Sequence, residues 1–162
     1  MQYTSVNNRV IECDSPDAAE VAFLAKLEAL VEDDSVTPDQ MRAVFYGLEN
    51  PALDPHALPG HAVITRASLR DPVFRIGIDC LTRKEIRAGR IDLAQMQAGY
   101  SLDVPTAAER LGVSPQAVRA GTDSFKYDAL FAKGQWWMRP EAVASLRLSR
   151  AGGRLVKITD PT

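Results

Sequence analysis

Four polar side chains of the kind that contact nucleic acid follow one another between residues 114 and 122. Ser114 and Pro115 supply an N-cap and a proline at the first helical position, so we expect a helix to begin there. Its polar positions are Ser114, Gln116, Arg119 and Thr122. Gln pairs bidentately with adenine and Arg with guanine, while a Ser hydroxyl at a helix N-terminus holds a phosphate. This chemistry suits the major groove of double-stranded DNA.

A helix in a groove needs a second helix to fix its angle, and the sequence predicts one just upstream. Thr106 and Glu109 have the spacing of a capping box, which places the start of this helix at Thr106. Gly112 permits the left-handed conformation that ends a helix. The apolar positions expected to pack the two helices together are Ala107, Ala108, Leu111, Val113, Ala117 and Val118.

A β-hairpin is expected further on, because residues 129–131 and 135–139 favour strands and Lys133-Gly134 favours a turn. Alternation along the second strand puts Trp136 and Met138 on one face, which we expect to be the core. The other face carries Gln135, Trp137 and Arg139. Pro140-Glu141 then opens a last helix that bears Val143, Leu146 and Leu148.

From 106 to 119 the chain reads TAAERLGVSPQAVR, and from 136 to 143 it reads WWMRPEAV. Over residues 100–148 the sequence resembles the winged helix-turn-helix domains of the excisionase and MerR-like type. Members of that group bind double-stranded DNA with the second helix in the major groove and the hairpin, the wing, near the minor groove. The resemblance implies a recognition helix at 114–121. The expected DNA contacts are Ser114, Gln116, Arg119 and Thr122 for the helix and Lys133, Gln135 and Arg139 for the wing.

The first 97 residues match no group by motif, but their patterns predict helices. One helix is expected after the N-cap Ser15, with Val21, Phe23, Leu24, Leu27, Ala29, Leu30 and Val31 as its apolar set. A second opens on the capping box from Thr37 to Gln40, carries Met41, Val44, Phe45 and Leu48, and ends near Asn50-Pro51. A third runs from Asp71-Pro72 to Gly89, with Val73, Ile76, Cys80 and Leu81 on one face.

The segments between these helices give weaker signals. Residues 1–14 are expected to form a loose arm or an edge strand, and residues 51–60 a proline-rich loop. Residues 62–64 fit either a strand or a first helical turn. Residues 91–102 are expected to join the two halves, with Gly99 and Ser101 as breakers.

The charge is uneven along the chain although the net value is only −2. Residues 1–97 carry ten Lys and Arg against fifteen Asp and Glu, and residues 98–162 carry nine against six. A basic C-terminal part suits a polyanionic partner. The run Arg66, Arg70, Arg75, Arg83, Lys84, Arg87 and Arg90 is either a solvated helix face or a second phosphate contact. Asp123 and Asp128 lie where acids oppose phosphate binding.

Motifs for catalysis, metals and membranes are missing from the sequence. Cys13 and Cys80 have no Cys or His cluster beside them, so we expect free thiols. His56 and His61 lack the neighbouring ligands of a metal site. There is no Gly-rich phosphate loop and no readable nucleophile with its base. No apolar run is long enough for a membrane span, and the start lacks a signal peptide pattern. We expect a cytoplasmic protein without cofactor, metal or catalytic residues.

The sequence thus predicts a mainly α protein in three parts: a helical module at 1–97, a winged helix-turn-helix with a small β-hairpin at 98–150, and a basic tail at 151–162. The leading hypothesis is a sequence-specific DNA-binding protein, a transcriptional regulator or an excisionase-like architectural factor, working as a homodimer. The alternative is a protein-interaction subunit of the antitoxin or phage-packaging kind. In that case the N-terminal module grips a protein partner, and the winged domain binds DNA weakly or not at all.

Overall fold

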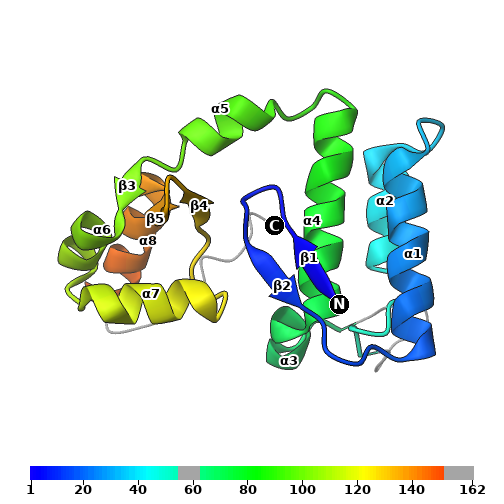
Figure 1. Ribbon diagram of the computed structural model, residues 1–162, viewed down its shortest axis with the longest axis horizontal. Helices are drawn as coiled ribbons and strands as arrows, with labels where there is room; N and C mark the ends of the chain where they lie inside the picture. Colours follow the sequence, from blue (N-terminus) through cyan, green and yellow to red (C-terminus); the bar gives the residue numbers. More distant parts are fainter. Residues whose placement is uncertain (55–62, 152–162) are drawn as a thin grey trace. The chain divides into compact units, whose positions relative to one another are not determined.

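The computed structural model describes residues 1–54 and 63–151. Within these ranges the chain forms eight helices and two small antiparallel sheets, so the expectation of a mainly α protein is confirmed (Figure 1). The chain divides into two compact units, Met1–Leu93 and Ala94–Thr162. Each unit has its own core and is described by itself.

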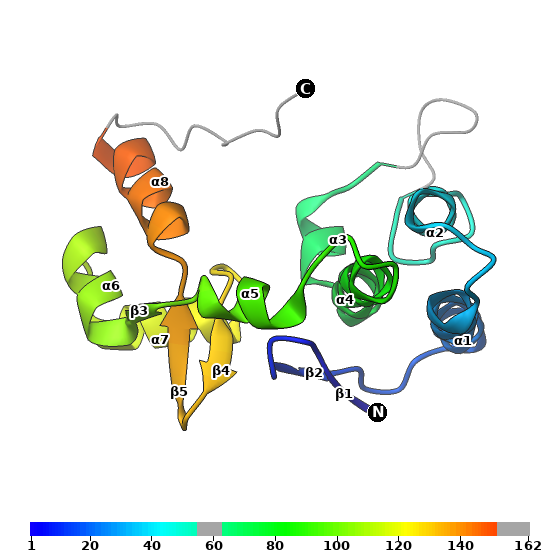
Figure 2. The same ribbon diagram turned by 90° about the horizontal axis from the view of Figure 1, so that it is seen from above.

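The first unit combines a β-hairpin with four helices (Figures 1 and 2). The strands β1 (Gln2–Thr4) and β2 (Val10–Glu12) pair antiparallel, and the helices are α1 (Ala18–Glu32), α2 (Pro38–Phe45), α3 (Arg66–Arg70) and α4 (Pro72–Arg87). Helix α4 packs against each of the other three, most extensively against α1. The side chains buried most completely between them are Leu27, Met41, Phe45, Val73, Ile76 and Cys80.

Helix α1 begins two residues later than its Ser-Pro signal predicted. Asp17 is the N-cap, and it exchanges capping-box hydrogen bonds with Glu20. Ser15 has φ of 50°, whereas an N-cap residue needs an extended backbone, so the predicted cap was wrong. The apolar set was also too wide, because Val21 is 51% exposed and Ala29 is exposed. The buried stripe is Phe23, Leu24, Leu27 and Val31.

Helix α2 has the predicted capping box between Thr37 and Gln40, but it ends at Phe45, short of the expected Asn50-Pro51. The Asn50 side chain folds back and donates to the Phe45 carbonyl at 2.8 Å, which satisfies an acceptor at the helix end. Leu48 lies beyond the helix and is 56% exposed. Most of the loop expected at 51–60, and both His56 and His61, lie outside the described residues.

The remaining predictions for the first unit concern α4, residues 62–64 and residues 1–14. Helix α4 starts at the N-cap Asp71, its predicted apolar face is buried, and Gly89 follows it with φ of 75°. Val63 forms an isolated bridge to Asp54, and α3 begins only after the N-cap Thr65. Of the two alternatives for residues 1–14, the strand is the one that forms: the segment holds the paired strands β1 and β2, and the Tyr3 hydroxyl donates to Asp79 of α4 at 2.5 Å.

The basic residues of α4 bind acids and carbonyls of the same unit. Arg83 forms a two-fold hydrogen-bonded pair with Glu28 at 2.7 and 2.6 Å, and Arg87 pairs with Asp34 at 2.7 Å. The Lys84 ammonium is buried and donates to the carbonyl of Asp33 at 2.6 Å, at the end of α1. These interactions hold α1 to α4. The hypothesis that this run contacts phosphates therefore loses its support at Arg83, Lys84 and Arg87.

The second unit consists of α5 (Leu93–Ala98), β3 (Leu102–Asp103), α6 (Val104–Leu111), α7 (Pro115–Asp123), β4 (Leu130–Ala132), β5 (Gln135–Met138) and α8 (Pro140–Ala151). Its sheet has the order β3-β5-β4. The segment expected only to join the halves thus contains a helix and a strand. The core side chains come from β3, β5, α6, α7, α8 and the segment between α7 and β4: Leu102, Val104, Ala107, Ala108, Leu111, Val118, Tyr127, Ala129, Met138 and Val143.

Candidate nucleic-acid interface

Helix α6 starts earlier than its Thr-x-x-Glu signal predicted, because Asp103 is the N-cap. The Asp103 carboxylate accepts from the Thr106 amide at 2.9 Å, and hydrogen bonds from Thr106 hold the pKa of Asp103 below its ordinary value. Pro105 suits this start because amides in the first helical turn have no partner within the helix, so a proline there loses no hydrogen bond. The earlier start brings Val104 into the core, where it is 4% exposed.

The turn between α6 and α7 follows the sequence signals closely. Gly112 has φ of 67°, and the Val113 amide donates back to the Ala108 carbonyl at 3.1 Å, so α6 closes in a left-handed cap. The Ser114 hydroxyl then accepts from the Ala117 amide at 3.1 Å and starts α7. As an N-cap, Ser114 is committed to the helix through this acceptor, although its side chain is exposed.

Helix α7 has one buried face and one exposed face. Val118, Gly121 and Thr122 point into the unit, whereas Gln116 and Arg119 are exposed and lie three residues apart on the outer face. Within the described residues, neither of these two side chains has a hydrogen-bond or ion-pair partner. Ala117 was expected to pack inward but is exposed. The outer face therefore presents Gln116 and Arg119 beside the small residues Ala117 and Ala120.

Thr122 does not belong to that outer face, so the exposure that its expected DNA contact requires is absent. It is 0% exposed, and its hydroxyl donates to the Arg119 carbonyl at 2.7 Å. The neighbouring Gly121 explains how close the packing is there: a Cβ at Gly121 would lie 2.3 Å from the ring of Tyr127. With 3.6 residues per helical turn, Thr122 lies about one turn after Val118 and on the same inward-facing side of α7.

The β4–β5 hairpin has the predicted turn. Lys133 and Gly134 have φ of 53° and 73°, the two left-handed residues of a tight hairpin turn, and Ala132 pairs with Gln135 across it. Lys133 and Gln135 are both exposed. Figure 2 shows the hairpin turn projecting away from α8. Both side chains are thus at the projecting end of the unit.

The two tryptophans of β5 occupy opposite faces, as alternation predicted. Met138 is 1% exposed in the core, and Trp136 packs against the core only in part, with its ring 5.1 Å from that of Phe131. Trp137 is half-buried on the other face, where its indole N–H donates to the Ala132 carbonyl at 3.0 Å. Trp137 therefore stiffens the hairpin.

Arg139 was assigned to the wing contacts, but it lies at the base of the hairpin in a polar cluster. Its guanidinium is 3.0 Å from the Asp128 carboxylate and 5.6 Å from the ring centre of Tyr100. The Tyr100 hydroxyl donates to the same carboxylate at 2.8 Å. No sequence signal pointed to this cluster, because Tyr100 and Asp128 are far apart in sequence. The Asp128 carboxylate is thus ion-paired with Arg139, whereas Asp123 is exposed at the end of α7.

The charge of the second unit is distributed differently from what the sequence halves suggested. Between residues 98 and 146 five basic residues balance five acidic ones: Arg110, Arg119, Lys126, Lys133 and Arg139 against Asp103, Glu109, Asp123, Asp128 and Glu141. The basic surplus lies wholly in residues 147–162, which hold four Lys or Arg and one Asp. General attraction to a polyanion is therefore concentrated at the C-terminal end of the chain.

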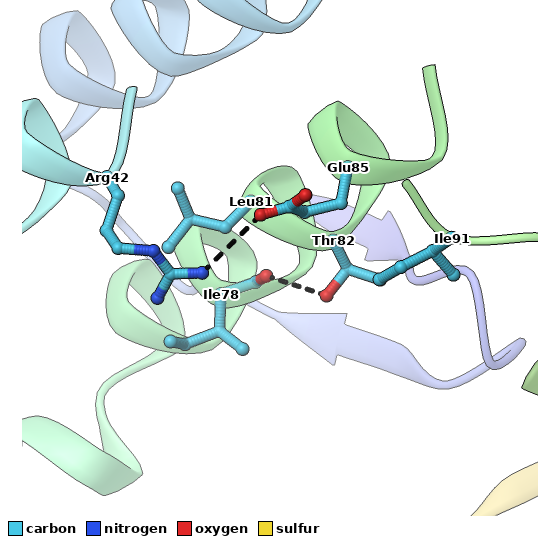
Figure 3. Close-up of a pocket in the computed structure, with 6 residues that line it drawn as sticks. All are labelled: Arg42, Ile78, Leu81, Thr82, Glu85 and Ile91. Carbon is cyan, nitrogen blue, oxygen red and sulfur yellow. Dashed lines mark hydrogen bonds and ion pairs between the residues drawn. The ribbon is translucent and has the colours of Figure 1, made fainter. Parts of the chain in front are cut away.

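A pocket of about 200 Å³ in the first unit offers no comparable chemistry (Figure 3). Figure 3 shows Arg42 of α2 directed at Glu85 of α4, 3.7 Å apart, and the Thr82 hydroxyl donates to the Ile78 carbonyl at 3.2 Å. These polar groups thus have partners within the unit. Across residues 1–54 and 63–151, no group of three or more His, Cys, Asp or Glu side chains is arranged to hold a metal ion.

Comparison with protein-family models, with characterised proteins and with solved structures found no match to this chain. No helix in the described part combines the length and apolar composition needed to cross a bilayer.

Proposed function

We propose that residues 94–151 form a winged helix-turn-helix and that the protein binds double-stranded DNA with the N-terminal half of α7 in the major groove. The supporting observation is the outer face of α7, where Gln116 and Arg119 are exposed and have no partner among the described residues. An α-helix fits the major groove, and these are the side chain types that pair with adenine and guanine. Ala117 and Ala120 beside them allow the helix to approach base edges closely.

The remaining contacts position the helix. The Ser114 hydroxyl hydrogen and the Gln116 amide suit a phosphate at this helix N-terminus, because Pro115 has no N–H and the Ala117 amide already donates to Ser114. Lys133 and Gln135 at the end of the β4–β5 hairpin, the proposed wing, reach the neighbouring backbone or the minor groove. Thr122 and Arg139 are left out of the proposed contact set, since the first is buried and the second is paired with Asp128.

Affinity in this proposal depends on more than one copy of the unit. Residues 98–146 carry no net charge, so the phosphate attraction of a single folded body is weak and the basic residues of 147–162 must supply it. A homodimer would double these contacts and address two half-sites about one helical turn, roughly 34–36 Å, apart. We place the proposed dimer contact in the first unit, within a cytoplasmic regulator or excisionase-like factor.

Selection from a library of randomised duplexes tests the base contacts. The full-length protein should enrich a motif containing a guanine that Arg119→Ala no longer selects, at a cost of about 1–3 kcal/mol in affinity for the wild-type motif. Arg119→Lys is the matched variant, because lysine keeps the charge but loses the planar fork that pairs with guanine. If Arg119→Lys preserves both affinity and motif, Arg119 contacts a phosphate; if no motif is enriched, the proposed base reading is wrong.

A second candidate function is that of a protein-interaction subunit, as in antitoxins or phage-packaging complexes. The balanced charge of residues 98–146 and the net negative first unit favour it. Under this function the first unit binds the partner, and DNA binding is weak or absent. Loss of the C-terminal basic residues would then leave partner binding unchanged.

A further inference from the structure

A shallow, open cavity of about 350 Å³ lies in the second unit, on the face of the hairpin that carries Leu130 and Trp137. Its volume falls within the range of pockets that hold small molecules, roughly 300–1,000 Å³. The residues that line it are Gln97, Ala98, Tyr100, Ser101, Leu130, Ala132, Lys133 and Trp137. Of these only Lys133 belongs to the proposed DNA contacts, so the cavity is a separate feature of the unit.

The aromatic walls of this cavity are held in place before any ligand arrives. The Trp137 indole is fixed by its hydrogen bond to the Ala132 carbonyl at 3.0 Å and stands opposite Leu130 in the strand register. Tyr100 is fixed by its hydrogen bond to Asp128 at 2.8 Å. Because these side chains are already ordered, a ring that stacks on them loses little further conformational entropy in the protein.

The charge of the cavity selects an anion. Lys133 is the only charged residue among the eight that line it, and its ammonium has no ion-pair partner within the described residues. The backbone at Lys133 is fixed by the hairpin turn, with φ of 53°. Around it the walls are apolar or neutral: an indole, a phenol ring, Leu130 and two alanines. A complementary ligand therefore has a flat apolar body and a single negative group at one end.

We propose that this cavity binds a small aromatic monocarboxylate, with its ring against Trp137 and Leu130 and its carboxylate on Lys133. If Lys133 also contacts a phosphate, the ligand and DNA compete for the same ammonium. The ligand then lowers DNA affinity, and DNA lowers ligand affinity by the same factor. This regulatory consequence rests on the proposed DNA-binding function, whereas the ligand site itself does not.

Nuclear magnetic resonance of the full-length protein tests the site, with 2-naphthoate as the probe and 2-naphthamide as its uncharged counterpart. We expect 2-naphthoate to shift the Trp137 indole resonance together with the amides of residues 97–101 and 130–137. The amide probe should bind about two- to fivefold more weakly, the range that one partly exposed ion pair supplies. Lys133→Gln should reduce naphthoate affinity to that of the amide. Lys126→Gln, the matched control, should not, because Lys126 lies outside the cavity.

Absence of shifts at these residues with millimolar naphthoate would overturn the proposal, and so would equal binding of the two probes or an unchanged affinity in Lys133→Gln. A duplex titration with and without naphthoate separates the two proposals. Binding of naphthoate without any binding of DNA rejects the proposed function and leaves the ligand site standing. Binding of DNA without naphthoate binding does the reverse.

Discussion

The guanidinium of Arg139 lies 3.0 Å from the carboxylate of Asp128 and thereby joins the end of β5 to the segment that precedes β4. The sequence analysis expected Arg139 to contact DNA and Asp128 to oppose phosphate binding, and this ion pair argues against both expectations. Arg139 is not a free DNA contact, and Asp128 is not a free acid facing phosphates. Of the side chains that we propose for base contact, Gln116 and Arg119 on α7 are exposed.

Two substitutions with the same change of charge test this assignment. Arg119→Gln should weaken binding to the selected DNA motif by about 1–3 kcal/mol, since it removes a base contact. Arg139→Gln should produce only the smaller, salt-screened effect of losing one positive charge from the unit. Fluorescence anisotropy with a labelled duplex measures both. Equal losses would mean that Arg139 contacts DNA despite its pairing with Asp128.

Thr122 should matter for stability and not for DNA binding. Thr122→Val keeps the shape but removes the hydrogen bond to the Arg119 carbonyl, at a cost of about 0.5–1.5 kcal/mol in the free energy of unfolding. Both tryptophans of the chain lie in the second unit, so tryptophan fluorescence in a denaturant titration reports that unit directly. A weaker DNA affinity with an unchanged unfolding curve would return Thr122 to the contact set.

Lys84 should be essential to the first unit. Its buried ammonium donates to the carbonyls of Leu30 and Asp33 at 2.8 and 2.6 Å, and α1 has no basic residue of its own in its last turn. Lys84→Met removes the lysine donor from both carbonyls, of which Asp33 keeps only its hydrogen bond from the Val36 amide, and should cost about 1–3 kcal/mol in stability. Arg87→Met, about one turn further along α4, should cost less because its ion pairs are exposed to solvent. Thermal unfolding followed by circular dichroism compares them, and equal costs would contradict the capping role of Lys84.

Asp79 should make the first unit less stable as the pH rises. Burial raises the pKa of this carboxyl above its ordinary value, against the opposing effect of hydrogen bonds from Tyr3 and Val6. Its neutral form is thus favoured by folding, and that contribution is complete below about pH 4 and is lost as the pH rises through the raised pKa. Asp79→Asn should therefore gain stability relative to the wild type between about pH 4 and pH 7. Denaturant titrations at several pH values measure the difference, and a constant difference would show that the pKa is unshifted.

Short-range signals in the sequence predicted where most helices lie, but not which of two neighbouring caps is used. Around Thr106 both Asp103 and the Thr-x-x-Glu box can start a helix, and burial of Val104 favours the earlier start. Around Ser15 the left-handed backbone excludes the serine and leaves Asp17. Local chemistry permits both alternatives, and tertiary packing selects between them.

The sequence did not predict the contacts between residues that lie far apart in the chain. Nothing in residues 1–14 indicates that Tyr3 reaches Asp79, or that Arg83 and Lys84 are occupied by α1. Basic residues at helical spacing are typical of a solvated face and of a phosphate contact alike, and only the opposing acids and carbonyls decide. On α7, by contrast, the polar or apolar character of the side chains predicted the exposure of Gln116 and Arg119 correctly, but it misplaced Ala117 and Thr122.

Titration of the full-length protein against labelled duplex DNA at two salt concentrations tests the central claim most directly. We expect binding at about 50 mM salt that weakens at least tenfold at about 200 mM, as the release of a few counterions requires. Absence of binding at the lower concentration, or an affinity indifferent to salt, would contradict the proposal that this protein binds DNA.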